Sequence, residues 1–254
     1  MLHKLAKTLD QAALNATSIP QLSLEADLDL NQAYKIQALS IEERLSRGEK
    51  LVGYKLGFTS RAKMLQMGVD DLIWGRLTDT MIVENNASID LSQYVHPRAE
   101  PEIAFKLKKS LSGNVTIEEA LDAIDGIAAA IEIIDSRYKN FKFSLTDVIA
   151  DNCSSTGFVI GDWHDPSVDI SNLRMALQVN GKDVAVGSSA DILDHPINSL
   201  VEAARCIALS GETLKPGQIV LAGAATAAAA LEHGQVISID IESLQNCKFN
   251  THSS

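Results

Sequence analysis

Cysteines and long apolar runs are scarce in this chain of 254 residues. The three cysteines, Cys153, Cys206 and Cys247, lie far apart in the sequence and form no CxxC pair, which argues against a zinc site and indicates a reducing compartment. No apolar run approaches the roughly 18 residues that a membrane-spanning helix requires. The first ten residues alternate charged and apolar side chains, unlike a signal peptide, and we therefore expect a cytoplasmic protein.

Basic residues are also in the minority. The chain has 22 Lys and Arg against 33 Asp and Glu, a formal net charge of -11, and its densest basic run is only Lys106, Lys108 and Lys109. An excess of negative charge repels phosphate groups and anionic lipids, so we expect neither a nucleic acid nor a membrane as a partner. The glycine motifs GxGxxG and GxxxxGKS/T are missing as well, which argues against a dinucleotide-binding or P-loop fold.

The pattern of apolar residues predicts an α+β fold with a helical beginning. Apolar residues recur at three- and four-residue spacing over residues 2–16 and 28–47, which predicts two helices. Short strand-like runs dominate after Gly48, so we divide the chain into a helical N-terminal region, residues 1–50, and a β-rich domain, residues 51–254. The predicted strands are 51–57, 80–83, 100–107, 127–134, 156–160, 174–179, 218–221 and 236–241, and the later helices are a short one carrying Met64 and Met67, then 117–124 and 199–210.

Three glutamates occupy unusual positions in this pattern. Glu100 and Glu102 flank Pro101 at the start of a predicted strand and so point to one face of it, as they would on a solvated edge strand. Glu132 lies inside an apolar strand that reads as buried on both faces, where an unpaired carboxylate is costly. Its partner could be an arginine, Arg98 or Arg137. Alternatively, the three glutamates surround one hard divalent cation, which prefers oxygen ligands.

Other polar residues interrupt apolar segments nearby. Lys55 lies between two glycines in a strand-like run, where it is either a lysine with its amine at the surface or a buried cation for acid–base chemistry or anion binding. The polar segment 135–143 follows the Glu132 strand directly, and Asp151 and Asn152 come soon after it. These residues could line a pocket or form an exposed loop.

Six short motifs follow one another along the chain. They are Gly53-Tyr-Lys-Leu-Gly-Phe-Thr-Ser60 with Gly68-Val69, Trp74-Gly-Arg-Leu-Thr-Asp79, His96-Pro-Arg-Ala-Glu-Pro-Glu-Ile-Ala104, Ile131-Glu132, Ala150-Asp-Asn152 and His195-Pro196. Taken in this order, they resemble the 2-keto-4-pentenoate hydratase / 4-oxalocrotonate decarboxylase family of the fumarylacetoacetate hydrolase superfamily. The resemblance covers nearly the whole chain, and the segments 59–69 and 135–143 look more like the decarboxylase branch.

The resemblance implies a mixed, strongly curved β-roll and a site built from residues of these motifs. The implied ligands of Mg²⁺ or Mn²⁺ are Glu100, Glu102 and Glu132. One departure from the family is Ala222, which stands where the family usually has a threonine that could hold a substrate carboxylate. The expected catalytic residues are Lys55, Asp79 and Arg137, and the expected substrate-binding residues are these three with Leu56, Asp151 and Thr226.

The implied reaction is the decarboxylation of 2-oxohex-3-enedioate to 2-hydroxypenta-2,4-dienoate, in which we expect Lys55 to assist proton transfer and Arg137 to hold the departing carboxylate. The alternatives are hydration of 2-hydroxypenta-2,4-dienoate, and a non-catalytic role in a hydratase complex, which the change at Ala222 favours and the retained glutamates oppose. The family further implies a homo-oligomer and a complex with a hydratase of the same pathway.

Overall fold

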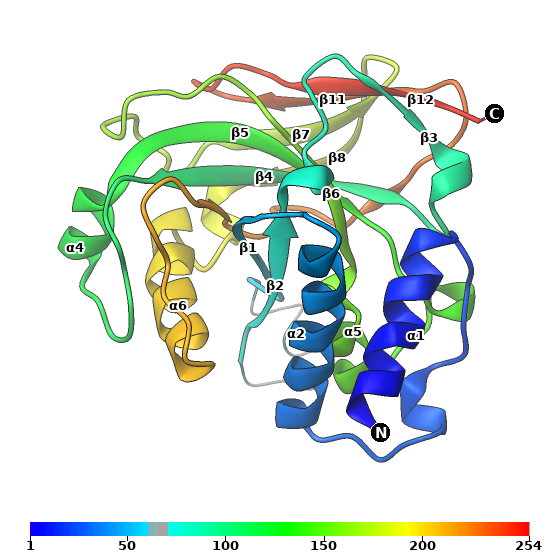
Figure 1. The fold of residues 1–254 in the computed structure, drawn as a ribbon. Coiled ribbons are helices and arrows are strands. Elements are labelled where there is room, and N and C mark those ends of the chain that lie inside the picture. Colours follow the sequence, from blue (N-terminus) through cyan, green and yellow to red (C-terminus); the bar gives the residue numbers. More distant parts are fainter. Residues whose placement is uncertain (61–63, 65–70, 254) are drawn as a thin grey trace.

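The computed structural model, which describes residues 1–60, 64 and 71–253, contains two mixed β-sheets, with the smaller sheet at the top of Figure 1 and most of the helices at the bottom. The larger sheet has the strand order β2-β1-β9-β4-β5-β6, with the two-residue β10 paired to β4. The smaller sheet has the order β3-β12-β11-β7-β8. Parallel pairs (β1 with β9, β12 with β3) occur beside antiparallel ones, so both sheets are mixed.

The elements of the chain have the following bounds. The strands are β1 Leu51–Gly57, β2 Ile73–Thr78, β3 Ser88–Asp90, β4 Arg98–Leu107, β5 Ile124–Ile134, β6 Ser155–Ile160, β7 Arg174–Val179, β8 Lys182–Ser188, β9 Ile219–Leu221, β10 Ala229–Ala230, β11 Val236–Ile241 and β12 Lys248–His252. The α-helices are α1 Leu2–Leu14, α2 Leu30–Ser46, α4 Ile117–Asp122, α5 Leu145–Ala150 and α6 Pro196–Leu209, and the 3-10 helices are η1 Leu22–Leu24, η2 Asp79–Met81, η3 Leu91–Gln93, η4 Lys139–Phe141, η5 Asn152–Ser154 and η6 Ser189–Asp191.

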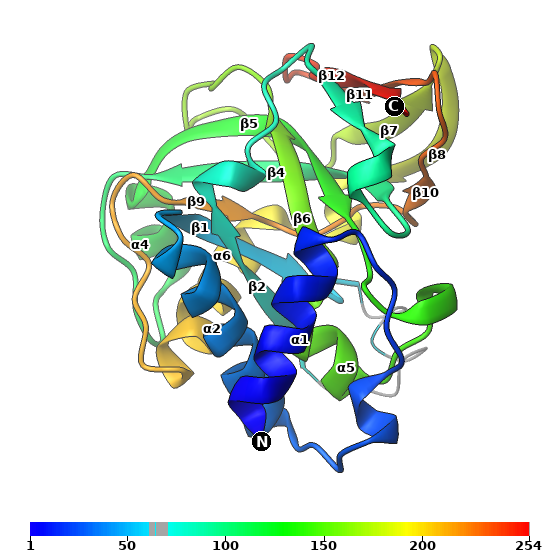
Figure 2. The same cartoon turned by 45° about the vertical axis from the view of Figure 1, so that its right-hand side comes forward.

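The two N-terminal helices are those that the periodicity predicts. Asp29 begins α2 with a capping box, in which its side chain accepts from the Gln32 N–H and the Gln32 side chain accepts from the Asp29 N–H. The helices α1 and α2 lie side by side next to α5 (Figure 2), and their apolar faces share one buried cluster that includes Ile36, Tyr138 and Ile149. The predicted division at residue 50 coincides with the start of β1, while this cluster ties the N-terminal helices to α5.

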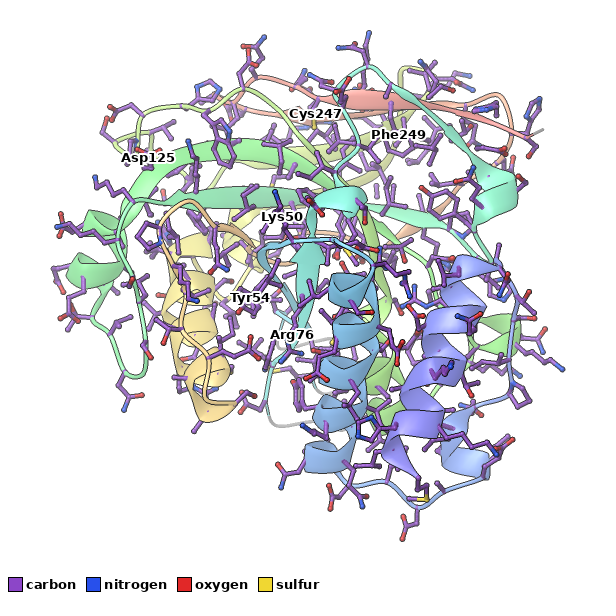
Figure 3. The ribbon with its side chains drawn as sticks, in the orientation of Figure 1. Lys50, Tyr54, Arg76, Asp125, Cys247 and Phe249 are labelled. Carbon is purple, nitrogen blue, oxygen red and sulfur yellow. The ribbon has the colours of Figure 1, made fainter. Side chains whose placement is uncertain are left out.

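The larger sheet has two different faces, because successive side chains of a strand alternate. One face bears Lys55 on β1, Glu102 on β4 and Glu132 on β5, and we call it the site face. The opposite face bears Tyr54, Leu56, Ile103 and Phe105, which pack in the main core with α6 and the smaller sheet. Figure 3 labels Phe249 of β12 and Cys247, which directly precedes β12, and both belong to the same core.

The structure corrects the sequence prediction in one strand and adds several elements. Residues 80–83 were predicted as a strand, but they contain the end of η2 instead. The strand in this part of the chain is β2, which precedes η2 and pairs with β1. The helix α5 and the strands β3, β10 and β12 are additional. Met64 is helical, whereas Met67 lies outside the described residues. Within the described part of the chain, no helix has the length and apolar character needed to cross a membrane.

Candidate metal and substrate site

Three carboxylates meet on the site face because β4 and β5 pair antiparallel in a fixed register. Glu100 lies opposite Glu132, and Glu102 lies two residues further along β4 on the same face. Each glutamate offers an oxygen atom, and these three oxygens all lie within 4.8 Å of one another. Glu102 and Glu132 are fully buried, and Glu100 is partly exposed. The three glutamates therefore lie together, as the sequence interpretation expected.

The cluster holds an excess of buried negative charge. Lys55 Nζ lies 2.9 Å from Glu132 Oε2, and the Gly223 N–H donates to Glu102 Oε2 over 2.7 Å. The remaining oxygens, Glu102 Oε1 and Glu132 Oε1, are buried and accept no hydrogen bond from the residues that the structure describes. Burial and the charge of Glu132 raise the pKa of Glu102 well above its usual range, and burial also raises the pKa of Glu132 although Lys55 opposes this shift.

A hard divalent cation fits this donor set. Burying an ionised carboxylate without a partner costs roughly several kcal/mol of folding free energy, unless a proton or a cation neutralises it. The three glutamates supply only oxygen atoms, the ligands that hard divalent cations such as Mg²⁺ prefer. A second acidic group, Asp71, Glu202 and Cys206, differs because Arg205 already pairs with both of its carboxylates.

Lys55 is held by the backbone of η5 as well as by Glu132. Its Nζ donates to Cys153 O over 3.3 Å. This contact needs a glycine at position 75, opposite Lys55 in the β1–β2 pair, because a Cβ there would lie 2.6 Å from Asn152 O. Burial alone would lower the pKa of Lys55, but the carboxylates around it, led by Glu132, raise its pKa instead, so the ammonium form is favoured.

Asn152 anchors η5 to the sheet. Its side-chain amide accepts from Arg76 N–H and donates to Arg76 O, both over 2.8 Å, and so pairs with the free edge of β2 as another strand would. The three residues Asn152, Cys153 and Ser154 all have positive φ, at 51°, 51° and 60°. Consecutive non-glycine residues in this region are strained, so the anchor supports a backbone conformation that the chain does not favour by itself.

Gly223 is a site residue that sequence reasoning did not single out. Its φ of 105° favours glycine, and a Cβ at this position would lie 2.2 Å from Thr59 Oγ1. The glycine thereby lets its N–H reach Glu102. The signal in the sequence was the segment around Ala222, where the missing threonine hydroxyl pointed to the substrate and not to the glycine that follows.

Arg137 and Asp151 are bound to each other and not to the glutamates. Arg137 Nε donates to Asp151 Oδ1 over 2.5 Å, and the Arg137 backbone N–H donates to Asp151 Oδ2 over 3.0 Å. The other guanidinium nitrogens donate to Asp135 O, Thr156 Oγ1 and Asp151 O. Burial raises the pKa of Asp151 to about 6 although Arg137 opposes the shift. The positive charge predicted to hold a substrate carboxylate is thus already engaged in a buried ion pair.

Three further predicted residues lie in different surroundings. Asp79 Oδ1 accepts from the Lys50 N–H over 2.9 Å, at the far end of the β1–β2 hairpin from Lys55; Figure 3 labels Lys50 at this end. The Leu56 side chain lies in the main core on the opposite face of the sheet. Thr226 is buried in the loop after β9, which runs beside the start of β4 because the Ala225 N–H donates to Pro101 O. Of these three, only Thr226 borders the strand that carries two of the glutamates.

Known proteins resemble this chain over almost its full length. The family described as fumarylacetoacetate (FAA) hydrolase C-terminal matches residues 52–250. Over 248 residues the chain is 53% identical to a 4-oxalocrotonate decarboxylase of Pseudomonas sp, covering 98% of this chain and 97% of that protein. It is 32% identical over 253 residues to the 2-keto-4-pentenoate hydratase of Paraburkholderia xenovorans strain LB400, covering 98% and 94%. The structure of 4-oxalocrotonate decarboxylase from Pseudomonas putida G7, complexed with magnesium and adipate, has a TM-score of 0.95 to it at 34% identity, covering 98% and 97%.

Proposed function

The chain belongs to the fumarylacetoacetate hydrolase family, and we propose that it is a metal-dependent decarboxylase that converts 2-oxohex-3-enedioate into 2-hydroxypenta-2,4-dienoate and CO₂. The α+β fold and the family predicted from the sequence are confirmed. The observation that carries the chemistry is the cluster of three glutamates beside Lys55, two of them fully buried. The preference for decarboxylation over hydration follows the identities, 53% against 32%.

The glutamates and Lys55 have different roles in the proposed reaction. Glu100, Glu102 and Glu132 would hold Mg²⁺ or Mn²⁺, and the cation would supply Lewis-acid stabilisation for the negative charge that develops at the 2-oxo group. Loss of CO₂ from the distal carboxylate moves an electron pair toward that oxygen, which must gain a proton to give the 2-hydroxy product. We infer that Lys55 donates this proton, and its contacts support this role, because Glu132 and Cys153 O engage only two of the three N–H donors of its ammonium group.

The two reactions of the family can be separated by measuring two products. We expect the purified protein with Mg²⁺ to release CO₂ from 2-oxohex-3-enedioate in step with substrate loss, and to consume 2-hydroxypenta-2,4-dienoate slowly in comparison. CO₂ release can be followed by a coupled assay and diene loss by ultraviolet absorbance. Rapid diene loss without CO₂ release would instead identify a hydratase. Failure of the protein to bind Mg²⁺ together with oxalate would favour the non-catalytic partner.

Changing Asn152 to Ala tests how η5 supports Lys55. The variant loses both bonds to Arg76, and we expect turnover to fall about 10-fold or more, the effect typical of groups that orient a site residue. Magnesium affinity should change less than about threefold, because no glutamate contacts Asn152. Turnover and isothermal titration with Mg²⁺ measure the two effects. Asn246→Ala, at an exposed turn, is the matched control and should leave both unchanged.

Assembly and location are separate proposals. The homo-oligomer, the complex with a hydratase of the same pathway and the cytoplasmic location are supported by the family resemblance alone. The dicarboxylate substrate has additional support, since a related structure contains adipate together with magnesium.

A further inference from the structure

A linear dicarboxylate bound at the glutamates needs a positive charge for its distal end. Arg137 does not supply one, because its guanidinium group is engaged by Asp151, Asp135 O and Thr156. Lys55 does not supply one either, because it is buried against Glu132 at the metal end. Among the residues that the structure describes, we therefore look for this cation elsewhere on the site face.

Arg98 has the position that such a cation requires. It is the first residue of β4 and lies opposite Ile134, so it stands on the same face as Glu100 and Glu102, two and four residues before them. Burial decreases along this row, since Glu102 is fully buried whereas Glu100 and Arg98 are partly exposed. The row thus leads from the buried glutamates toward solvent, with Arg98 at its outer end.

The Arg98 guanidinium has a packed face and unused edges. Its central carbon lies over the Phe141 ring, 4.1 Å from the ring centroid, so one face of the group has an aromatic partner. Among the residues that the structure describes, no carboxylate pairs with Arg98 and no side-chain hydrogen bond uses its nitrogens. A guanidinium stacked on a ring keeps its N–H donors in the plane, where they can bind a carboxylate with two hydrogen bonds.

The distances agree with a six-carbon diacid. Two residues of a strand span about 7 Å, which separates Arg98 from Glu100 along β4. The five carbon–carbon bonds of an extended hexanedioate span roughly 6 Å, since three backbone bonds span about 3.5 Å. One carboxylate can therefore lie at the glutamates while the other lies within reach of the long Arg98 side chain.

We propose that Arg98 binds the distal carboxylate of the substrate and so selects dicarboxylates over monocarboxylates of the same length. This assignment rests on the proposed function, because it takes the glutamates as the binding site for the 2-oxo end. The contact is made in the ground state and weakens as CO₂ departs. Arg98 is therefore a specificity residue, and its loss should raise KM more than it lowers kcat.

Two analogues that differ only at the distal end test the proposal. In the presence of Mg²⁺, the unchanged protein should bind 2-oxohexanedioate about 10- to 100-fold more tightly than 2-oxohexanoate, the range expected for a charge-assisted pair with a carboxylate. In Arg98→Met the preference should fall below about threefold while the affinity for 2-oxohexanoate stays the same. Arg98→Lys keeps the charge without the planar fork and should show an intermediate preference. Competitive inhibition of turnover gives these affinities.

The possible outcomes separate the two proposals. Binding of 2-oxohexanoate by the variants shows that the site is folded, and Arg174→Met, an arginine of the smaller sheet paired with Asp183, is the control for loss of one charge. A wild-type preference in Arg98→Met would overturn the role of Arg98 and leave the metal end intact. Equal affinity of the unchanged protein for both analogues would also overturn the role of Arg98 without affecting the proposed binding of the 2-oxo end. If the unchanged protein with Mg²⁺ binds neither analogue, the proposed function falls, and the role of Arg98 falls with it.

Discussion

Glu132→Gln is expected to abolish magnesium binding in the micromolar to millimolar range and to lower turnover by roughly 10³-fold, since a Lewis-acid cation contributes several kcal/mol to the transition state. Glutamine keeps the size of the side chain and removes its charge. Glu132 is central to the cluster because it lies opposite Glu100 in the register and pairs with Lys55. Isothermal titration with Mg²⁺ and steady-state kinetics with 2-oxohex-3-enedioate measure the two losses.

The thermal stability of the same variant distinguishes lost binding from lost folding. Mg²⁺ should raise the Tm of the unchanged protein, because a ligand that binds only the folded state stabilises it. The Tm of Glu132→Gln should not respond to Mg²⁺. Glu84→Gln removes one exposed carboxylate elsewhere on the surface and should behave as the unchanged protein does. If Glu132→Gln retains both magnesium affinity and turnover, the three-glutamate site is wrong.

The clustering of the three glutamates could be predicted from the sequence because these residues depart from the local patterns. A glutamate within the apolar strand β5 is costly unless it has a partner, and two glutamates around Pro101 in β4 place two like charges on one face. The antiparallel register of β4 and β5 then brings the three together without help from any loop. Lys55 gave the same kind of signal, a charge between glycines in a buried strand.

The strand β2 escaped prediction for a related reason. Arg76 lies in its middle, and a charged residue in a short strand weakens the apolar signal. In the structure Arg76 is buried and donates to Gln37 on α2 and to Glu212, which also accepts from Tyr54. Figure 3 labels Tyr54 and Arg76 near α2. These partners come from segments far apart in the sequence, and their contacts cannot be read from local spacing.

Arg137 illustrates the same limit for function. Its place directly after the Glu132 strand favoured a role at the pocket, and the sequence could not show that Asp151 binds it. Arg98, by contrast, was considered only as a possible ion-pair partner of Glu132. The structure gives Arg98 an aromatic partner instead, which leaves its charge uncompensated among the described residues. The position of Arg137 in the sequence indicated the region of the site. Only the folded structure shows that Asp151 occupies Arg137, whereas Arg98 contacts an aromatic ring.

Lys55→Met is expected to lower kcat by about 10²- to 10⁴-fold, the usual contribution of a positioned proton donor, while magnesium binding persists. Methionine fills the buried space of the lysine stem and lacks the ammonium group. Magnesium affinity should stay equal or rise, because the cation no longer competes with Lys55 for Glu132. Single-turnover kinetics and isothermal titration with Mg²⁺ measure the two quantities. Turnover within about threefold of the unchanged protein would make Lys55 a structural residue.

The metal-free form of this variant should also depend more strongly on pH. Folding raises the pKa of the Glu102 carboxyl, so the folded state holds its proton more tightly and stability falls as pH rises above the usual carboxyl range. In Lys55→Met, no ammonium group offsets the negative charge that Glu102 and Glu132 acquire as the pH rises. The Tm of this variant should therefore fall more steeply with pH. Saturating Mg²⁺ should remove most of this dependence. Lys106→Met, which breaks the exposed pair with Asp125 labelled in Figure 3, is the matched control and should change neither the pH dependence nor turnover, because an exposed ion pair contributes little.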